Sequence, residues 1–245
     1  MTEPLFLADL DAPEVGQLVA LTGEEARHAA AVRRLRVGEV ILISDGNGTA
    51  VRGPVATADK TGLAITVEEV LHTPASGVKY VAVQALPKGD RAEIAVEMLT
   101  ELGIDEIVPW QAERSAVHWA PDRTERGLTR WRTIAREAAT QCRRFRVPTV
   151  SMPMTTAELA LRIAQTDLTV VLHAAATDPL GSFELPASGE VMFIIGPEGG
   201  LTEEEVSTFT AAGGRAALIS DAVLRTSTAG VVALAQLQAL GVRAH

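Results

Sequence analysis

The segment VMFIIGPEGGLTEEE, residues 191–205, decides the fold of this chain. Its first five residues are apolar, which predicts a strand buried on both faces, and three glycines then allow the backbone to turn tightly. Thr202 and Glu205 form a capping pair that predicts a helix over 202–212. A doubly buried strand, a glycine turn and a capped helix in succession are typical of a parallel sheet with helices on both faces.

The same alternation extends on both sides of this segment. Asp90 with Glu93 is expected to cap a helix that Gly103 ends, and Thr155 with Glu158 is expected to cap another. Apolar strands are predicted at 80–86, 104–109, 169–173, 191–195 and 216–219, and further helices at 124–143, 155–164 and 228–240. We therefore expect an α/β domain over residues 78–245.

Residues 1–72 follow a different pattern. Short strands are expected at 39–44, 49–57 and 63–71, with a turn through Gly46 and Gly48, and one helix is expected at 23–35. This pattern indicates a small β-barrel with an inserted helix. The segment TPASG, residues 73–77, is typical of a linker between domains.

The composition narrows the class of protein. The chain has 245 residues, of which 47% are apolar and 22% charged, so we expect a sizeable buried core. Cys142 is the single cysteine, which excludes an intramolecular disulfide, and the five histidines are scattered, so we expect no metal site. There is no run of about 18 apolar residues and the first twelve residues are acidic, which predicts a cytoplasmic protein with no membrane partner.

Charge is distributed unevenly along the chain. The formal net charge is −9, yet the window 123–146 carries eight arginines against Glu125 and Glu137. A second group of arginines, Arg27, Arg33, Arg34 and Arg36, lies near the N-terminus. Arginine in preference to lysine suits bidentate phosphate contacts, so we favour a phosphate partner for the first window. A solvated helix face is the alternative for both groups.

Three strand ends are candidates for a ligand site, because open parallel sheets bind ligands where strands end and helices begin. They are the strand end and glycine turn 194–200, the segment 218–228 that contains Arg225, and the strand end 172–174 that contains His173. The glycine turn matches neither a dinucleotide fingerprint nor a phosphate loop. A tight strand-to-helix turn, helix capping near Arg225 and a structural His173 are the simpler alternatives.

Taken together, the motifs resemble the RsmE family, bacterial enzymes that methylate N3 of a uridine in 16S ribosomal RNA. LPKGDR (86–91), TELGIDEIVP (100–109), ERS (113–115), EAA (137–139) with Gln141 and Arg144, IGPEGG (195–200) and LRT (224–226) occur in the order seen in that family. His28 and VRRLRVG (32–38) resemble its PUA-like RNA-binding domain. The resemblance covers nearly the whole chain.

The resemblance implies a PUA-like β-barrel followed by a SPOUT-class α/β domain whose sheet carries a deep trefoil knot. It implies S-adenosylmethionine as the cofactor, a homodimer with sites completed by the neighbouring subunit, and 16S rRNA within the small ribosomal subunit as the partner. The cofactor contacts that it implies are Leu172, Gly196, Pro197, Glu198, Gly199, Gly200, Leu218, Ile219, Leu224 and Thr226. The RNA contacts that it implies are Arg33, Arg34, Arg36, Lys88, Arg114 and Arg144.

Methyl transfer to N3 of uridine needs a group that removes the N3 proton or stabilises the resulting anion. We favour Arg225 as the stabilising group and consider Glu198 as the base, with the alternative that Glu198 holds loop backbone amides. The chain departs from the family pattern at Ser227, where Glu is usual, at Ser220 and Asp221, where Gly or a neutral residue is usual, and at Arg143, where a small residue or Gly is usual.

Two other functions fit parts of the sequence. A non-catalytic RNA-binding or ribosome-assembly protein would account for the arginine groups equally well, but it does not require a glycine-rich loop beside a polar strand end. A nucleotide-dependent enzyme with phosphates on the turn 196–200 is weaker, because neither a lysine nor a metal-binding acid accompanies the turn.

Overall fold

The computed structural model describes residues 3–28, 35–59, 62–74 and 76–243. The chain divides into two compact units, residues 1–75 with 136–147 and residues 76–135 with 148–245. The segment 136–147, which the sequence analysis assigned to the second domain, thus belongs to the first unit.

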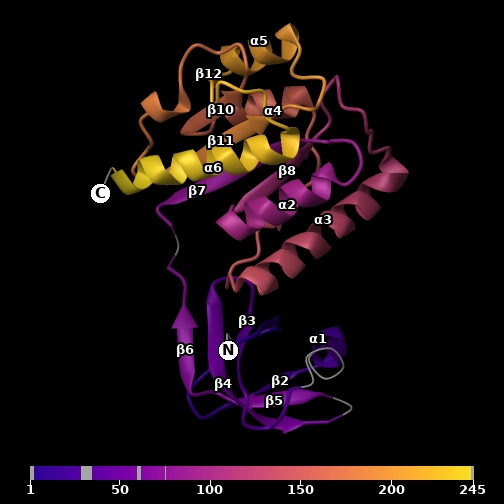
Figure 1. Ribbon diagram of the computed structural model, residues 1–245, viewed down its shortest axis with the longest axis vertical. Helices are drawn as coiled ribbons and strands as arrows, with labels where there is room; N and C mark the ends of the chain where they lie inside the picture. Colours follow the sequence, from indigo (N-terminus) through magenta and orange to yellow (C-terminus); the bar gives the residue numbers. More distant parts are fainter. Residues whose placement is uncertain (1–2, 29–34, 60–61, 75, 244–245) are drawn as a thin grey trace. The chain divides into compact units, whose positions relative to one another are not determined.

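The first unit is built on a six-stranded sheet (Figure 1). Its strands are β1 (Leu5–Leu7), β2 (Leu18–Leu21), β3 (Val40–Ser44), β4 (Thr49–Ala58), β5 (Leu63–Thr66) and β6 (Glu69–His72), and the described part of this unit also contains helix α1 (Gly23–His28) and, within 136–147, the end of a longer helix. The strand order is β1-β3-β4-β5-β2, with β6 paired to β4. Phe6, Leu21, Ile41 and Ile43 lie in its core.

The strands expected at 39–44 and 49–57 are confirmed as β3 and β4. The single strand expected over 63–71 is wrong, because β5 and β6 pair with different parts of β4. At Gly53 of β4 a Cβ atom would lie 1.8 Å from the carbonyl oxygen of Thr66, the last residue of β5. The backbones of β4 and this residue therefore come very close together at the point where β5 ends. The helix expected over 23–35 is confirmed as far as His28, and residues 29–34 lie outside the described part of the chain.

The second unit contains a six-stranded sheet, and its parallel arrangement was predicted from the sequence. Its strands are β7 (Val78–Ala85), β8 (Glu106–Trp110), β9 (Thr149–Val150), β10 (Leu168–Leu172), β11 (Gly189–Ile195) and β12 (Arg215–Ala217). The order is β12-β10-β11-β7-β8-β9, and every neighbouring pair is parallel. The short strand β9 was not predicted from the sequence.

The helices are α2 (Arg91–Leu102), α3 (Pro121–Cys142), α4 (Thr156–Ile163), α5 (Glu203–Ala211) and α6 (Thr226–Arg243), with a 3-10 turn η2 (Leu180–Ser182). The capping boxes expected at Thr155 and Thr202 are confirmed. The cap expected at Asp90 is wrong: its side chain makes no capping bond, and Glu93 instead pairs with Arg130 of α3 at 2.7 Å. Gly103 ends α2 with a φ of 84°, as expected.

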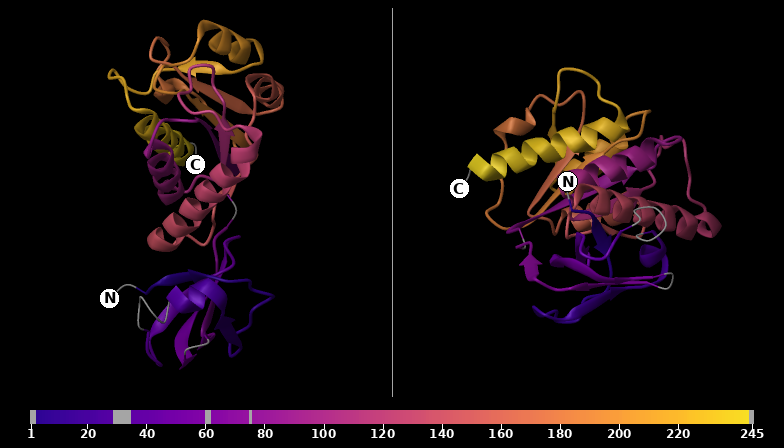
Figure 2. Two further views of the ribbon diagram at one scale, coloured as in Figure 1. Left: turned by 90° about the vertical axis from the view of Figure 1, so that its right-hand side faces the viewer. Right: turned by 60° about the horizontal axis from the view of Figure 1, so that its bottom comes forward.

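Helices cover both faces of this sheet (Figures 1 and 2). One face packs Val83 and Ile194 against Leu159 of α4 and Phe209 of α5. On the other face α2 and α6 pack together, and a Cβ atom at Gly230 of α6 would lie 3.3 Å from Ile195. Both strand faces are therefore buried, which explains the continuous apolar runs in the sequence. The trefoil knot that the resemblance implies stays a prediction.

The described residues contain neither a membrane-spanning helix nor a cluster of metal-ligating side chains. No helix in them is both long and apolar enough to cross a membrane. Nor do the described histidines, cysteines and carboxylates gather three together in a way that could hold a metal ion.

Candidate functional site

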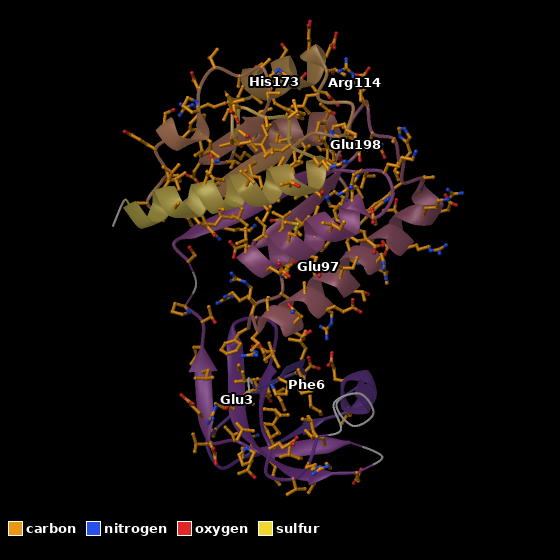
Figure 3. The ribbon with its side chains drawn as sticks, viewed as in Figure 1. Glu3, Phe6, Glu97, Arg114, His173 and Glu198 are labelled. Carbon is orange, nitrogen blue, oxygen red and sulfur yellow. The ribbon has the colours of Figure 1, made fainter. Side chains whose placement is uncertain are left out.

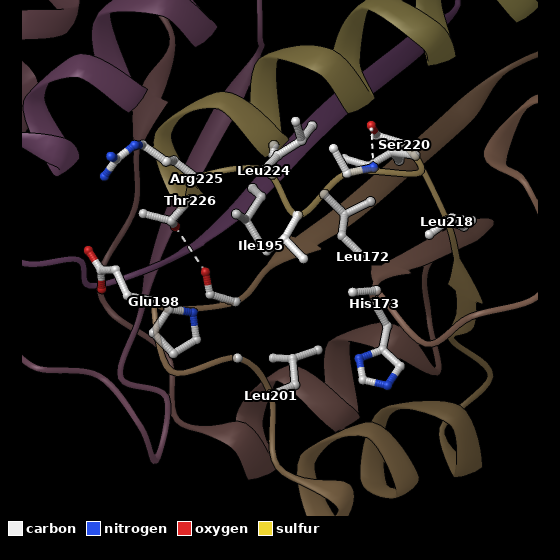
Figure 4. A pocket seen from close by; sticks show the side chains of 18 of the residues that line it. Leu172, His173, Ile195, Glu198, Leu201, Leu218, Ser220, Leu224, Arg225 and Thr226 are labelled. Atoms are coloured by element: carbon white, nitrogen blue, oxygen red, sulfur yellow. Dashed lines mark hydrogen bonds between the residues drawn. The ribbon is translucent and has the colours of Figure 1, made fainter.

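A cavity of about 460 Å³ lies at the carboxyl ends of β10, β11 and β12 (Figure 4). The three strand ends singled out in the sequence meet here, because parallel strands end at the same edge of the sheet. Its lining includes Leu172, His173, Ile195, Gly196, Pro197, Glu198, Gly200, Leu201, Leu218, Ile219, Ser220, Leu224, Arg225 and Thr226. Nine of the ten cofactor contacts implied by the resemblance are among the lining residues, and Gly199 is the exception.

The wall of the cavity is mostly apolar and its polar groups are few. Leu172, Ile195 and Leu218 contribute aliphatic surface, while His173, Glu198 and Arg225 bring ring nitrogens, a carboxylate and a guanidinium. In the wider view Arg114, His173 and Glu198 lie toward the same end of this unit, away from Glu97 of α2 (Figure 3). Such a lining suits a ligand that combines an apolar ring system with a charged end.

Gly199 and Gly200 of the glycine loop are required for two different structural reasons. Gly200 has a φ of 71°, which residues with a side chain rarely adopt, and its N–H donates to the carbonyl of Pro197. Gly199 does not line the cavity: a Cβ atom there would lie 3.0 Å from the Cβ of Arg114. Its glycine is therefore explained by packing against Arg114 rather than by direct approach to a ligand.

Arg114 and Glu205 hold this loop from outside the cavity. The guanidinium of Arg114 donates to the carbonyl oxygens of Gly199 and Leu201 at 3.2 and 3.4 Å. The buried carboxylate of Glu205 accepts the N–H of Glu113 at 2.8 Å as well as the N–H of Thr202 at 2.9 Å. The segment after β8 and the loop after β11 are thus joined by charged groups, and Arg114 has a structural task in addition to the RNA contact predicted for it.

A buried chain of hydrogen bonds joins the loop to α6. The hydroxyl of Thr226 donates to the carbonyl of Gly196 at 2.9 Å and accepts from Nε2 of Gln84 at 2.9 Å (Figure 4). Gln84 was not among the site residues predicted from the sequence. The signal was present, because Gln84 is the one amide in the otherwise apolar strand 80–86 and is fully buried.

The two candidate catalytic groups both border the cavity. The backbone carbonyl of Arg225 accepts the N–H groups of Thr228 and Ala229 at the start of α6, while its side chain is exposed and forms no ion pair within the described residues. The carboxylate of Glu198 accepts the N–H of Lys88 at 3.1 Å. This bond agrees with the alternative that Glu198 holds a backbone amide, and its second oxygen remains for other contacts.

The predicted RNA contacts are divided between the two units. Arg36 and Arg144 belong to the first unit and Lys88 and Arg114 to the second, while Arg33 and Arg34 lie outside the described residues. Much of the arginine window is engaged within the protein. Arg130 pairs with Glu93, Arg136 with Glu25, and Arg132 and Arg146 donate to the carbonyls of Val150 and Thr73.

Comparison with known proteins agrees with this architecture. Residues 74–238 match the family model of an RNA methyltransferase domain, and residues 21–68 match that of an RNA methyltransferase PUA domain. The chain is 39% identical over 238 residues to ribosomal RNA small subunit methyltransferase E of Mycobacterium tuberculosis, covering 96% of this chain and 90% of that protein. The corresponding protein of Bacillus subtilis is 30% identical, with 89% and 88% covered.

A solved structure shares the whole fold. The ribosomal RNA small subunit methyltransferase E of Neisseria gonorrhoeae, bound to S-adenosyl methionine, superimposes with a TM-score of 0.87 at 28% identity and covers 98% of both chains. Family models, relatives and fold all agree across both units. The chain therefore belongs to the family of ribosomal RNA small subunit methyltransferase E, enzymes of the SPOUT class.

Proposed function

We propose that this protein transfers a methyl group from S-adenosylmethionine to N3 of a uridine in 16S ribosomal RNA. The observation that carries the proposal is the cavity at the carboxyl ends of β10, β11 and β12, in a chain that belongs to a family of rRNA methyltransferases. A scaffold protein would not need such a cavity, and the family assignment argues against the two other functions considered from the sequence.

The cavity residues fit S-adenosylmethionine. Leu172, Leu218 and Leu224 offer apolar surface for the adenine ring, and the open backbone at Gly200, where a Cβ atom would meet nothing within 4 Å, allows close approach. The bound cofactor would supply a sulfonium-activated methyl group, which needs no metal ion. The protein's own task is to orient the two reactants and to manage the charge that develops on the uracil ring.

That charge arises because N3 of neutral uridine carries a proton. In the overall reaction the N3–carbon bond forms, the sulfur–methyl bond breaks and the N3 proton leaves. Glu198 is the carboxylate of the glycine loop and is the candidate base, although the N–H of Lys88 already occupies one of its oxygens. Arg225 is an exposed cation at the rim, suited to stabilise the negative ring.

The reaction is also expected to depend on the compartment, the oligomeric state and the assembly state of the RNA. We expect the enzyme to act in the cytoplasm as a homodimer whose sites are completed by the neighbouring subunit, on 16S rRNA within the small ribosomal subunit. The dimer is tested by sedimentation at micromolar concentration, where a monomer would contradict it.

The function is tested by mapping uridine methylation on 16S rRNA from cells that lack the gene. Re-expression of the wild-type protein should restore one N3-methylated uridine, and Arg225→Ala should not, although calorimetry should show that this variant still binds S-adenosylmethionine. Arg225→Lys is the matched control, since it keeps the positive charge and should retain part of the activity. If uridine methylation of 16S rRNA were the same in cells with and without the protein, the proposal would be refuted.

A further inference from the structure

A second cavity lies on the same unit, beside the segment that joins β7 to α2. Its volume is about 180 Å³, less than half that of the first cavity. The residues that line it come from this segment, from α2, from the loop after β8 and from α3. They are Leu86, Pro87, Gly89, Ala92, Glu93, Val117, Trp119, Gly127, Arg130 and Trp131.

One wall of this cavity is a tryptophan held in a fixed position. A Cβ atom at Gly127 would lie 2.6 Å from two ring carbons of Trp119, so the indole rests directly on the backbone of α3. The ring meets Trp131 edge to face, with centroids 5.3 Å apart. The backbone N–H of Trp119 donates to the side-chain oxygen of Gln111. Trp119 is only half-buried, so part of its ring is accessible to a ligand.

Exposed cations lie next to the lining residues of this cavity in the sequence. Arg123 and Arg126 precede Gly127 and Arg130 on α3 at helical spacing, and Lys88 precedes Gly89. Lys88, Arg123 and Arg126 are exposed, and their charged groups form no ion pair within the described residues. The neighbouring acids are Asp90, Asp122 and Glu125, which are exposed, and Glu93, which lines the cavity and pairs with Arg130.

The two cavities lie on either side of the same short segment. Arg91 lines the larger cavity, whereas Pro87, Gly89 and Ala92 line the smaller one. The N–H of Lys88, between Pro87 and Gly89, donates to Glu198 of the larger cavity. An RNA strand that presents its uridine to the cofactor at the rim of the larger cavity can therefore place a neighbouring base in the smaller one.

We propose that the smaller cavity binds a nucleobase of single-stranded RNA next to the methylated uridine, stacked on Trp119. The inference rests on the proposed function for the identity of the RNA. An aromatic surface surrounded by cations is the combination that single-stranded nucleic acid requires, since bases stack on the ring and phosphates meet the charges. An unstructured protein segment could pack against the apolar wall, but it would not account for the exposed cations Lys88, Arg123 and Arg126.

Tryptophan fluorescence gives a direct test, because the chain contains three tryptophans and the other two are buried. Trp110 is fully buried and does not line the cavity, so quenching by a short oligouridylate reports on Trp119 and on Trp131, which lines the cavity beside it and is 3% exposed. We expect saturable quenching with the wild-type protein. Trp119→Phe should bind the same oligonucleotide with much weaker quenching, because phenylalanine keeps a stacking surface and only Trp131 remains as a fluorophore in the cavity. Absence of quenching with the wild-type protein would overturn the proposal.

Two variants test the contribution to binding. Trp119→Ala should weaken RNA binding roughly 5- to 150-fold, the range for loss of one stacked base. Ala92→Leu should fill the cavity from a partly exposed position on α2 and also weaken binding. Both should raise KM for RNA while leaving the affinity for S-adenosylmethionine unchanged. Leu161→Ala is the matched control, since Leu161 is 70% exposed and lines neither cavity.

The outcomes separate this inference from the proposed function. Normal methylation with unchanged KM in both Trp119→Ala and Ala92→Leu would overturn the nucleobase site and leave the proposed function standing. If the wild-type protein methylated no uridine of 16S rRNA, the proposed function would be refuted. The fluorescence titration would still test the nucleobase site independently. Binding of an unstructured peptide but not of oligouridylate would also overturn the inference.

Discussion

The hydroxyl of Thr226 donates a hydrogen bond of 2.9 Å to the carbonyl oxygen of Gly196, which joins the first residue of α6 to the loop after β11. The same hydroxyl accepts from Gln84 of β7. Three segments that are distant in the sequence therefore meet at one oxygen atom beneath the candidate cofactor cavity. The position of the loop after β11 therefore depends on the position of the start of α6, and both line the cavity.

Thr226→Val should lower both stability and cofactor affinity. Valine has the shape of threonine but leaves the carbonyl of Gly196 without this donor and the amide of Gln84 without this acceptor. Each such buried polar group costs about 1–3 kcal/mol. Thr226→Ser keeps the hydroxyl and is the matched control. Chemical denaturation measures stability, and calorimetry with S-adenosylmethionine measures cofactor affinity. If both were unchanged in Thr226→Val, the hydroxyl of Thr226 would not hold the two cavity loops together.

Arg114→Ala should weaken binding of S-adenosylmethionine as well as binding of RNA. The reason is that Arg114 holds the carbonyls of Gly199 and Leu201 and so positions the glycine loop. If Arg114 were only an RNA contact, calorimetry without RNA would show no change in cofactor affinity. Lys88→Ala is a suitable comparison, because its exposed side chain forms no hydrogen bond in the described residues and cofactor affinity should stay close to that of the wild type.

Arg143→Gly should stabilise the protein. Arg143 follows the last residue of α3 and has a φ of 59°, a left-handed conformation that costs a residue with a side chain roughly 1–2 kcal/mol. Glycine relieves this cost but loses more backbone entropy on folding, about 0.5–1 kcal/mol. We expect a net gain of up to about 1 kcal/mol in the free energy of unfolding, measured by denaturation. Arg143→Ala keeps the strained conformation and should show no such gain.

The same residue explains a departure from the family pattern noted in the sequence. The resemblance implies a small residue or glycine at this position, and the left-handed conformation through which the chain leaves α3 accounts for that preference. The sequence showed that Arg143 was unusual, but only the backbone angle gives the reason.

Local features of the fold were predictable from the sequence. The capping pairs Thr155–Glu158 and Thr202–Glu205 act over three residues, and the structure contains both. The gathering of three strand ends into one cavity was predictable too, because it follows from parallel topology.

Long-range contacts were not predictable. Gln84 and Thr226 are 142 residues apart, and Glu205 reaches the backbone of a residue 92 positions away. No short-range pattern marks these partners. At the start of α2 an ion pair with Arg130 replaced the cap that local spacing favoured, so a tertiary contact outweighed a local one.

Acid should destabilise the α/β unit through Glu106. Burial alone would raise the pKa of this carboxyl, but hydrogen bonds from Arg162, Lys79 and Ser151 outweigh it and lower the pKa from 4.5 to about 2. A lowered pKa in the folded state means that the ionised form stabilises the fold above the unfolded value. This contribution should be lost as the pH falls from about 4.5 to about 2.

Glu106→Gln tests this expectation, because glutamine keeps the shape but has no charge to titrate. The variant should be less stable than the wild type at neutral pH, since Arg162 and Lys79 lose a charged partner. The difference between the two proteins should shrink as the pH falls below 4.5. Denaturation at a series of pH values measures it, and a difference that stays constant down to pH 2 would contradict the assigned pKa.

The first unit should contribute to RNA binding through Arg36. This residue is exposed, and its guanidinium forms no ion pair within the described residues. If it contacts one phosphate of single-stranded RNA, Arg36→Ala should reduce the slope of log affinity against log salt concentration by about 0.7, because one fewer counterion is released. Arg36→Lys keeps the charge and should keep the slope. Cofactor affinity should not change in either variant, since Arg36 does not line the cofactor cavity. An alanine variant with the wild-type salt slope would remove Arg36 from the RNA interface.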